Sequence, residues 1–350
     1  MNEQMIIYGL LAIVLLVFVL PFAVRRVEEN LEAFLFIMGV AACLVSGQMN
    51  AELMLEALEE PWKISLAVLA AGAVFYGLRE HFSAGMQAVF RHVPVWLVVF
   101  VMVLLLGLLS SLITAIVAAI VLVELILLLP MDKAGQAKVC ILACFAIGMG
   151  AALTPLGEPL STIAVARLNE DFMYLFRLLG RYIIPSVVCF AAIAGVYSAI
   201  YQRRAIRSLK TEAAQAQEEV EPDDVKSIVV RALKVYLFVM ALVFLGDGLE
   251  PLIEKYVLGM SPTLLYWVNM VSAILDNATL AAAELSPSMS EITQKAILMG
   301  LLVSGGMLIP GNIPNIIAAS RLKIGATDWA KLGLPLGLIA MGLFYLILFI

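Results

Sequence analysis

Apolar runs, most of them as long as a membrane helix, follow one another along almost the whole chain and are separated by short polar stretches. A helix that crosses a bilayer needs about 20 predominantly apolar residues. The first run is long enough to span and has no basic segment before it, so it predicts a transmembrane helix rather than a signal peptide. The pattern predicts an all-α polytopic membrane protein. The hydrophobic windows fall at 5–24, 33–48, 64–80, 94–129, 139–168, 182–202, 229–247, 262–285, 294–322 and 333–350.

Two of these windows are interrupted by closely similar stretches, ALTPLGEPLSTIAVARL at 152–168 and MLIPGNIPNIIAASRL at 307–322. Proline removes a backbone donor and glycine loosens the chain, so each window predicts a broken transmembrane helix that unwinds and resumes. Unwound backbone at membrane depth needs protein or a water-filled cavity around it. Interruptions at corresponding places in two halves of a chain indicate a transporter binding site. The predicted breaks contain Pro155 and Gly157, and Pro310 and Gly311.

Two other windows have the wrong length for a single crossing. The 94–129 window is too long for one helix, whereas 262–285 is short for two, and each has small or polar residues near its middle. Each window therefore predicts a re-entrant helical hairpin that enters and returns on the same side. The polar residues at the predicted tips are Ser110 and Thr114 in the first hairpin and Ser272 and Asp276 in the second.

The hairpins and broken helices occur in the same order in two parts of the chain, which predicts an internal repeat. Aligning Arg167 with Arg321 also places Gly157 opposite Gly311, and the hairpins align with Ser110 opposite Ser272. If the N-terminus is external, the first unit starts outside and the second inside, so the two units are inverted repeats. We expect an N-terminal transmembrane helix pair at 1–48, inverted repeat 1 at 64–202, a cytoplasmic linker at 203–228 and inverted repeat 2 at 229–350.

Composition and charge agree with this topology. The chain is 63% hydrophobic and 14% charged, with a mean hydropathy of +1.02, which excludes an ordinary soluble domain. Sixteen of the 22 lysines and arginines fall in loops assigned to the cytoplasm, as the positive-inside rule requires. We expect a multi-pass protein of a prokaryotic inner (plasma) membrane, in contact with membrane lipids. The net charge of −5 is modest and unclustered, so nucleic acid is not expected as a partner.

Ionisable residues inside apolar windows are costly, by at least about 2.5–3.5 kcal/mol for a central aspartate, and each needs a reason. Asp276 stands with Asn277 at the second hairpin tip and is followed by Thr279. Carboxylate, amide and hydroxyl oxygens suit a hard cation such as Na⁺, and a carboxylate in a partly desolvated cavity can also hold H⁺. The alternative is an Asx turn or a helix cap that closes the hairpin without binding an ion.

Glu158 lies inside the first break and is the second candidate carboxylate. Thr154 and Ser161 offer neighbouring hydroxyl oxygens, whereas the second break has Asn312 and Asn315 and no carboxylate. Half-helix ends add about half a unit charge of either sign, so broken helices can stabilise bound ions. The alternative role for Glu158 is a cap of the second half-helix.

Three other carboxylates lie in apolar windows. Glu124 and Glu284 each follow a hairpin tip, and capping or snorkelling is the simpler interpretation for both. Asp247, in LGDGLEP, is expected near a helix end, where a turn role is favoured over a proton relay. LGDG is similar to an intramembrane aspartyl protease motif, but no second aspartate pairs with it, and two-carboxylate catalysis needs both. We therefore expect a protein that is not an enzyme.

At these residues the chain resembles the ion transporter superfamily, and most closely its NhaD-type sodium/proton antiporter branch, with a side branch of cation transporters as a further possibility. TPLGEP at 154–159, SAILDNATLAAA at 272–283 and VSGGMLIPGNIPNIIA at 303–318 carry the likeness. It covers about 64–350 and implies alternating access by a mobile unit against a scaffold, often in a homodimer. Carried over by position, Asp276 and Asn277 would form the Na⁺ or H⁺ site and Glu158 the second carboxylate. The resemblance also makes Thr154, Ser161 and Asn315 candidate ligands.

The resulting expectation is a secondary active transporter, a monovalent cation (Na⁺)/H⁺ antiporter without a cofactor beyond the transported ions. Competition between Na⁺ and H⁺ at Asp276 and Glu158 would couple the two fluxes. The alternative is a Na⁺-coupled symporter of a small anion or dicarboxylate, in which half-helix N-termini bind the anion. An intramembrane hydrolase is disfavoured because no paired catalytic residues converge. A passive channel is the remaining alternative, but broken helices in both halves favour alternating access.

Overall fold

The computed structural model describes residues 3–209, 225–256, 259–275 and 277–350. These residues form helices joined by short turns, and no strand occurs among them. The described part of the chain contains six helical segments long and apolar enough to cross a membrane, which confirms an all-α polytopic membrane protein. These segments are Glu3–Ala23, Val95–Ile113, Lys133–Ala151, Tyr174–Tyr201, Ile228–Ile253 and Ala326–Phe349.

The helices follow one another with short connections, and the two 3₁₀ helices lie in the second half of the chain. In order they are α1 (Glu3–Ala23), α2 (Arg25–Glu29), α3 (Leu31–Ser46), α4 (Ala51–His92), α5 (Val95–Ile113), α6 (Ala115–Leu127), α7 (Lys133–Ala151), α8 (Pro159–Leu168), α9 (Tyr174–Leu209), α10 (Val225–Tyr256), α11 (Pro262–Val268), η1 (Asn269–Ala273), α12 (Asn277–Glu284), α13 (Glu291–Gly305), η2 (Ile309–Gly311), α14 (Ile313–Leu322) and α15 (Ala326–Phe349).

Both predicted helix breaks are present. α7 ends at Ala151 and α8 begins at Pro159, while α13 ends at Gly305 and α14 begins at Ile313 after the short η2. A proline stands at the start of each resumed helix. A backbone N–H at this position would have no intrahelical acceptor, so proline, which lacks it, loses no hydrogen bond there. These prolines therefore begin the resumed helices, several residues after the preceding helices have ended.

The two windows of unusual length are also divided. The 94–129 window splits into α5 and α6 at Thr114, and 262–285 splits between η1 and α12. Asp276 lies in that second division but outside the described residues.

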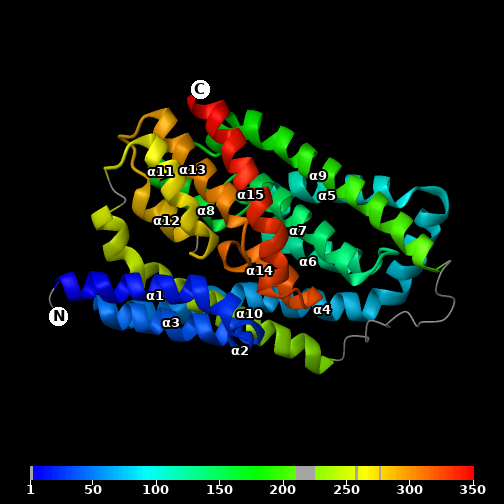
Figure 1. The fold of residues 1–350 in the computed structure, drawn as a ribbon, viewed down its shortest axis with the longest axis horizontal. Helices are drawn as coiled ribbons and strands as arrows, with labels where there is room; N and C mark the ends of the chain where they lie inside the picture. Colours follow the sequence, from blue (N-terminus) through cyan, green and yellow to red (C-terminus); the bar gives the residue numbers. More distant parts are fainter. Residues whose placement is uncertain (1–2, 210–224, 257–258, 276) are drawn as a thin grey trace.

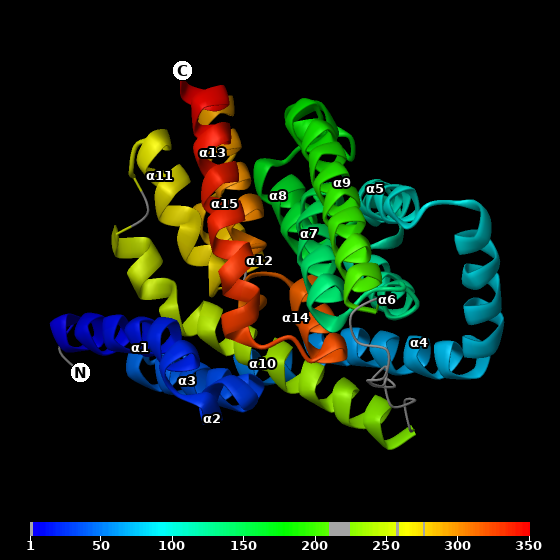
Figure 2. The same ribbon diagram turned by 45° about the vertical axis from the view of Figure 1, so that its right-hand side comes forward.

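Two groups of helices stand side by side (Figure 2), with α5, α7 and α9 packed in one and α11, α13 and α15 in the other. The second half of each divided window also contacts a helix from the other part of the chain: α6 packs against α14, and α12 against α8. α1, α3 and α10 lie together along one side and cross these groups instead of running parallel to them (Figure 1). The two helix breaks are consequently enclosed by helices from both parts of the chain.

Asp247 lies in the interior of α10 and not near a helix end, so the expectation of a turn role is wrong. The glycines on either side of it explain the LGDG string. A methyl group at Gly246 would lie 2.7 Å from the side chain of Thr279, and one at Gly248 would lie 2.6 Å from Cβ of Ala42. The two glycines therefore let α12 and α3 approach α10 closely, which is a packing function.

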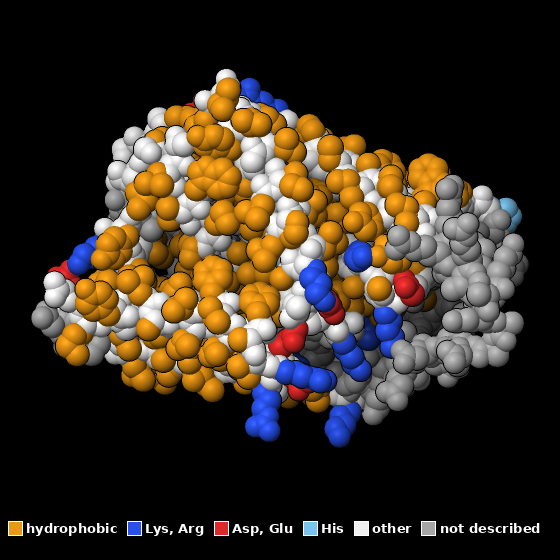
Figure 3. Space-filling model, viewed as in Figure 1, with side chains coloured by type: hydrophobic (Ala, Val, Ile, Leu, Met, Phe, Trp, Pro, Cys, Tyr) orange, Lys and Arg blue, Asp and Glu red, His pale blue; other side chains and the backbone are white. Residues whose placement is uncertain are grey.

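Hydrophobic side chains cover most of the face seen in Figure 3, and charged side chains gather near α2 and the start of α15. Leu15 on α1 and Leu343 and Ile347 on α15 are more than half exposed, at 63%, 57% and 59%. Exposed apolar surface of this extent suits contact with lipid and not with water.

Candidate functional site

Asn315 holds together the unwound backbone of the second break. Its Nδ2 donates hydrogen bonds to the carbonyl oxygens of Gly305, at 2.8 Å, and Leu308, at 2.9 Å. A helix end leaves carbonyl groups without intrahelical donors, and in an apolar environment these must be satisfied by other protein groups. The side chain is fully buried, and its Oδ1 has no hydrogen-bond partner among the described residues. Asn315 thus stabilises the break and leaves one amide oxygen available.

Asn277 lies beside the same break. It is the first residue of α12 and is 4% exposed, and its Nδ2 is 3.7 Å from the position of a methyl group at Gly305. The hairpin tip therefore meets the second break where Asn315 contacts it. Asp276 directly precedes Asn277 but lies outside the described residues, so its predicted role stays a prediction.

The first break is tied to its own hairpin by backbone and side-chain bonds. The amide of Ala115 donates to the carbonyl of Gly157 at 2.8 Å, and the Thr154 hydroxyl donates to the carbonyl of Ser111 at 2.5 Å. Thr162 donates to the carbonyl of Pro155 at 2.5 Å. Thr154 is thus occupied in joining break to hairpin.

Thr114 has a left-handed backbone at the division between α5 and α6. Its φ of 74° is uncommon for a residue other than glycine, and such a conformation costs about 1–3 kcal/mol. Its Oγ1 accepts a hydrogen bond from the amide of Val117 at 3.3 Å, so it caps α6. The predicted hairpin tip is thus a strained single-residue turn.

Glu158 and Asn312 occupy the same place in the two breaks. Each is the N-cap residue of the resumed helix, each has φ of −157°, and neither side chain makes a capping hydrogen bond. Both are buried, at 6% and 7% exposure. The Asn312 amide nitrogen lies only 2.7 Å from the position of a methyl group at Gly148 of α7, so it reaches the other part of the chain. The cap alternative for Glu158 accounts for its backbone but not for its side chain.

Ser161 and Thr279 differ in where the structure puts them. Ser161 is fully buried one turn into α8, and its hydroxyl has no hydrogen-bond partner among the described residues. Thr279 lies against Gly246 of α10. We therefore retain Ser161 as a candidate ligand and interpret Thr279 as a packing contact.

Equivalent contacts hold the hairpins to the broken helices in the two parts of the chain. Ser110 donates to the carbonyl of Ile147 at 3.1 Å, and Ser272 donates to the carbonyl of Leu301 at 3.4 Å. The alignment that pairs Gly157 with Gly311 also pairs Ile147 with Leu301. Each serine therefore links its divided window to the helix that precedes a break.

Glu124 forms an ion pair instead of capping a helix or snorkelling. Arg321 of α14 donates to its two carboxylate oxygens at 2.8 and 3.2 Å, and both side chains are largely buried. The pair joins α6 to α14. Sequence reasoning missed it because the two residues are far apart in the chain.

A second polar cluster lies between the legs of the second hairpin. Asn269 Nδ2 donates to Glu284 Oε2 at 2.8 Å, and the Ser304 hydroxyl donates to the carbonyl of Asn269 at 2.8 Å. Asn269, Glu284 and Ser304 are 0%, 2% and 0% exposed. Sequence reasoning noted Glu284 but not its partners, and a buried asparagine on the same hairpin was the available signal.

A cavity of about 1660 Å³ opens at the charged end of the molecule. It extends inward along Ile141 of α7 to Ile309 and Ile316, which flank the second break. Its charged rim comes from loops that the positive-inside rule assigns to the cytoplasm. The charged lining residues are Arg25, Glu28, Glu29, Glu32, Lys133, Lys138, Lys234, Arg321, Lys323, Asp328 and Lys331.

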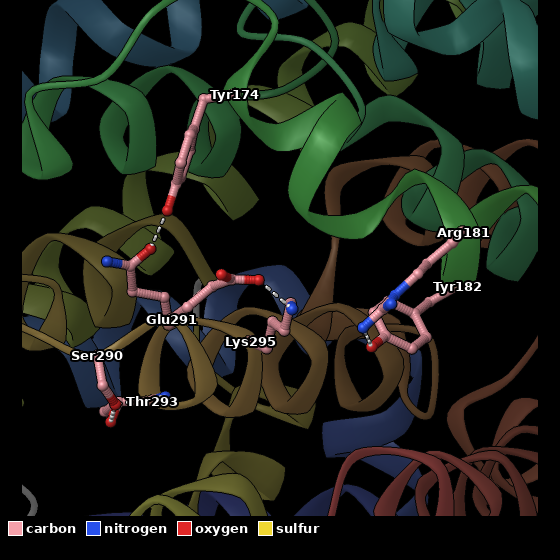
Figure 4. Close-up of polar contacts among 8 residues, drawn as sticks. Tyr174, Arg181, Tyr182, Ser290, Glu291, Thr293 and Lys295 are labelled. Atoms are coloured by element: carbon pink, nitrogen blue, oxygen red, sulfur yellow. Dashed lines mark hydrogen bonds and ion pairs between the residues drawn. The ribbon is translucent and has the colours of Figure 1, made fainter.

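At the opposite end, polar contacts join the starts of α9 and α13 (Figure 4). The Tyr174 hydroxyl hydrogen-bonds to Gln294, and Lys295 pairs with Glu291 on α13. In the preceding turn, hydrogen bonds from Arg177 hold the pKa of Asp171 below its usual value. The two helix groups are thus in contact here and separated by the cavity at the other end.

No curated protein matches this sequence. The family described as a protein of unknown function, DUF1646, matches residues 7–350, which is nearly the whole chain. The match therefore includes both helix breaks, both divided windows and the cavity. The chain belongs to the DUF1646 family.

Proposed function

We propose that the protein is a secondary active transporter that exchanges Na⁺, or another monovalent cation, for H⁺ by alternating access. The observation that carries this proposal is the meeting of a hairpin tip with an unwound helix at Asn277, Gly305 and Asn315. Two other residues of this broken helix, Ile309 and Ile316, line the large cavity. Discontinuous helices at corresponding places are a recurrent design of ion sites in transporters.

The proposal includes two inverted repeats, each made of a re-entrant hairpin and a broken helix. Three matches support it. α8 and α14 have the same length and end at left-handed residues, Asn169 with φ of 55° and Lys323 with φ of 52°. Ser110 and Ser272 make equivalent bonds. The exchange of partners between the units, α6 with α14 and α8 with α12, supports it as well.

The ion would bind where carboxylate, amide and hydroxyl oxygens converge. Asp276 and Glu158 would supply the charge, and Asn277, Asn315 and Ser161 further oxygens. Protonation of the carboxylates would release the cation on one side of the membrane, and deprotonation on the other side would readmit it. The N-termini of α8 and α14 and the C-termini of α7 and α13 end at the breaks and add fixed partial charges.

The cavity supports an inward-open state, since it opens at the end rich in lysine and arginine. In the outward-open state the contact between Tyr174 and Gln294 would separate and the cavity would close. We propose that the protein resides in a prokaryotic inner membrane, surrounded by lipid and paired with a second copy.

Sodium-coupled uptake of a small anion is the second candidate. Seven basic and four acidic residues line the cavity, an excess that attracts anions. Two half-helix N-termini at the breaks would also favour an anion.

Proteoliposomes that enclose a pH-sensitive dye test both candidates. A proton gradient is imposed, and Na⁺, Li⁺, K⁺ and small dicarboxylates are added in turn to the wild type, to Asp276→Asn and to Glu3→Gln. Glu3 forms an exposed ion pair with Lys255, away from the lining of the cavity, and serves as the control carboxylate. Cation-evoked proton flux that only Asp276→Asn abolishes supports antiport. Sodium-dependent anion accumulation without cation-evoked proton flux would overturn antiport in favour of symport.

A further inference from the structure

Asn269 and Glu284 face each other between the two legs of the second hairpin. One hydrogen bond joins them, from Asn269 Nδ2 to Glu284 Oε2 at 2.8 Å. Among the described residues, Glu284 Oε1 and Asn269 Oδ1 are both buried without a hydrogen-bond partner. A buried carboxylate with an unsatisfied oxygen is unfavourable unless a proton or a cation joins it.

These two unpartnered atoms are complementary. A protonated carboxyl and a primary amide can form a ring of two hydrogen bonds, in which the amide N–H donates to one carboxyl oxygen and the carboxyl O–H donates to the amide oxygen. The first of these bonds is present, and the second needs the two atoms that lack partners. A single proton on Glu284 Oε1 therefore satisfies both side chains.

The pair occurs in the second half of the chain only. In the alignment that pairs Ser110 with Ser272, Asn269 corresponds to Gly107 and Glu284 to Leu122. Ser304 fixes the backbone of Asn269 and so holds the amide in place. The first half forms its divided window with glycine and leucine at these two positions. The fold therefore does not by itself require the Asn269–Glu284 pair.

Three helices pack against α12, namely α8, α10 and α13. Lys295 on α13 is paired with Glu291, and Asp247 and Glu250 on α10 are acidic. The described charged groups on these three helices and at their caps are Glu158, Arg167, Lys226, Lys234, Asp247, Glu250, Lys255, Glu291 and Lys295.

We propose that Glu284 is the residue that carries the coupled proton, on a site separate from the cation site at the hairpin tip. This inference rests on the proposed antiport, and it assigns the coupled proton to Glu284 in place of direct competition at Asp276 and Glu158. The proton comes from water on one side, resides on Glu284 Oε1 while the ring with Asn269 is closed, and returns to water when movement of the hairpin opens the ring. The cation and the proton would then be coupled through the position of the hairpin.

Glu284→Gln tests the separation, because glutamine can form the same ring with Asn269 but cannot lose a proton. Two fluxes are measured in proteoliposomes: proton flux evoked by Na⁺, and ²²Na⁺ counterflow at equal pH on both sides. For Glu284→Gln we expect at least a tenfold loss of the proton flux and counterflow within about twofold of wild type. Asp276→Asn should lose both, and Glu3→Gln, which breaks an exposed ion pair outside the cavity, neither.

If the Glu284→Gln protein retains the proton flux, the inference about Glu284 is wrong, while the proposed antiport stands. Loss of both fluxes, with a melting temperature equal to that of wild type, would also overturn it, since Glu284 would then belong to the cation site. If the wild type shows neither flux, the proposed function fails. Infrared spectroscopy then tests separately whether Glu284 is protonated. A carboxylic acid band at neutral pH that Glu284→Gln removes supports the protonated pair, and its absence refutes it.

Discussion

Arg321 and Glu124 form a two-point ion pair, at 2.8 and 3.2 Å, between the second broken helix and the second leg of the first hairpin. Both side chains are largely buried, at 12% and 15% exposure. Solvent therefore screens the pair less than a surface ion pair. It links the two parts of the chain at the rim of the cavity.

Glu124→Gln is expected to destabilise the protein by about 1–3 kcal/mol, because Arg321 loses a charged hydrogen-bond partner in a partly buried position. The measurement is thermal unfolding of purified protein in detergent. The exposed pair between Arg25 and Glu29 offers the control, and Glu29→Gln should change stability by less than about 1 kcal/mol. Equal losses of stability for Glu124→Gln and Glu29→Gln would contradict the greater contribution expected of the buried ion pair.

Asn315→Leu is expected to lower both stability and transport. The substitution has similar volume but leaves the carbonyls of Gly305 and Leu308 without their donor, at a cost of about 1–3 kcal/mol for each buried group. Unfolding by heat measures the first effect and the proteoliposome assay the second. The control for the change from asparagine to leucine is Asn30→Leu, at an exposed position. Asn169 is unsuitable because its left-handed backbone would be strained by leucine. A stable Asn315→Leu protein would show that the break does not need this side chain.

Gly150→Ala is expected to be strongly destabilising, by more than the roughly 1–3 kcal/mol typical of overpacking. A methyl group there would lie 1.7 Å from the carbonyl oxygen of Gly107, and backbone cannot move aside as a side-chain tip can. Gly342→Ala is the matched control, since nothing lies within 4 Å of its added methyl group. We expect Gly342→Ala to be neutral or stabilising by up to about 1 kcal/mol, because alanine favours a helix. Expression level and melting temperature report both.

Thr114→Gly is expected to be more stable than Thr114→Ala by about 1 kcal/mol. Both lose the cap on α6, but only glycine adopts a φ of 74° without strain. Melting temperatures of the two variants give the comparison. Equal stability would mean that the hairpin tip relaxes to another backbone conformation.

Ser320→Cys should react with a membrane-impermeant maleimide added from the cytoplasmic side, because Ser320 lines the cavity and is partly exposed. The background is Cys189→Ser, which removes the exposed cysteine. Leu343→Cys, exposed on α15, should react poorly because lipid covers it. Labelling of Ser320→Cys only from the external side would reverse the proposed topology.

Much of the fold follows from local properties of the chain. Apolar windows of membrane-helix length predict helices, and Pro155 and Gly157 predict a break, because hydrophobicity and missing backbone donors act within a few residues. The divisions at Thr114 and before Asn277 were predicted from window length in the same way. Asp247 was misplaced because the glycines beside it indicate a turn in sequence, whereas in space they admit two neighbouring helices.

The candidate site depends on contacts between distant segments. Sequence alone identified Asn277, Asn315 and Glu158 as polar residues in apolar surroundings, since burying such groups is costly wherever they go. Only the tertiary structure placed Asn277 and Asn315 at the same glycine, paired Glu124 with Arg321, and joined Asn269 to Glu284. The physical reason is that the need for a hydrogen-bond partner is local, whereas the partner is chosen by helix packing across the whole chain.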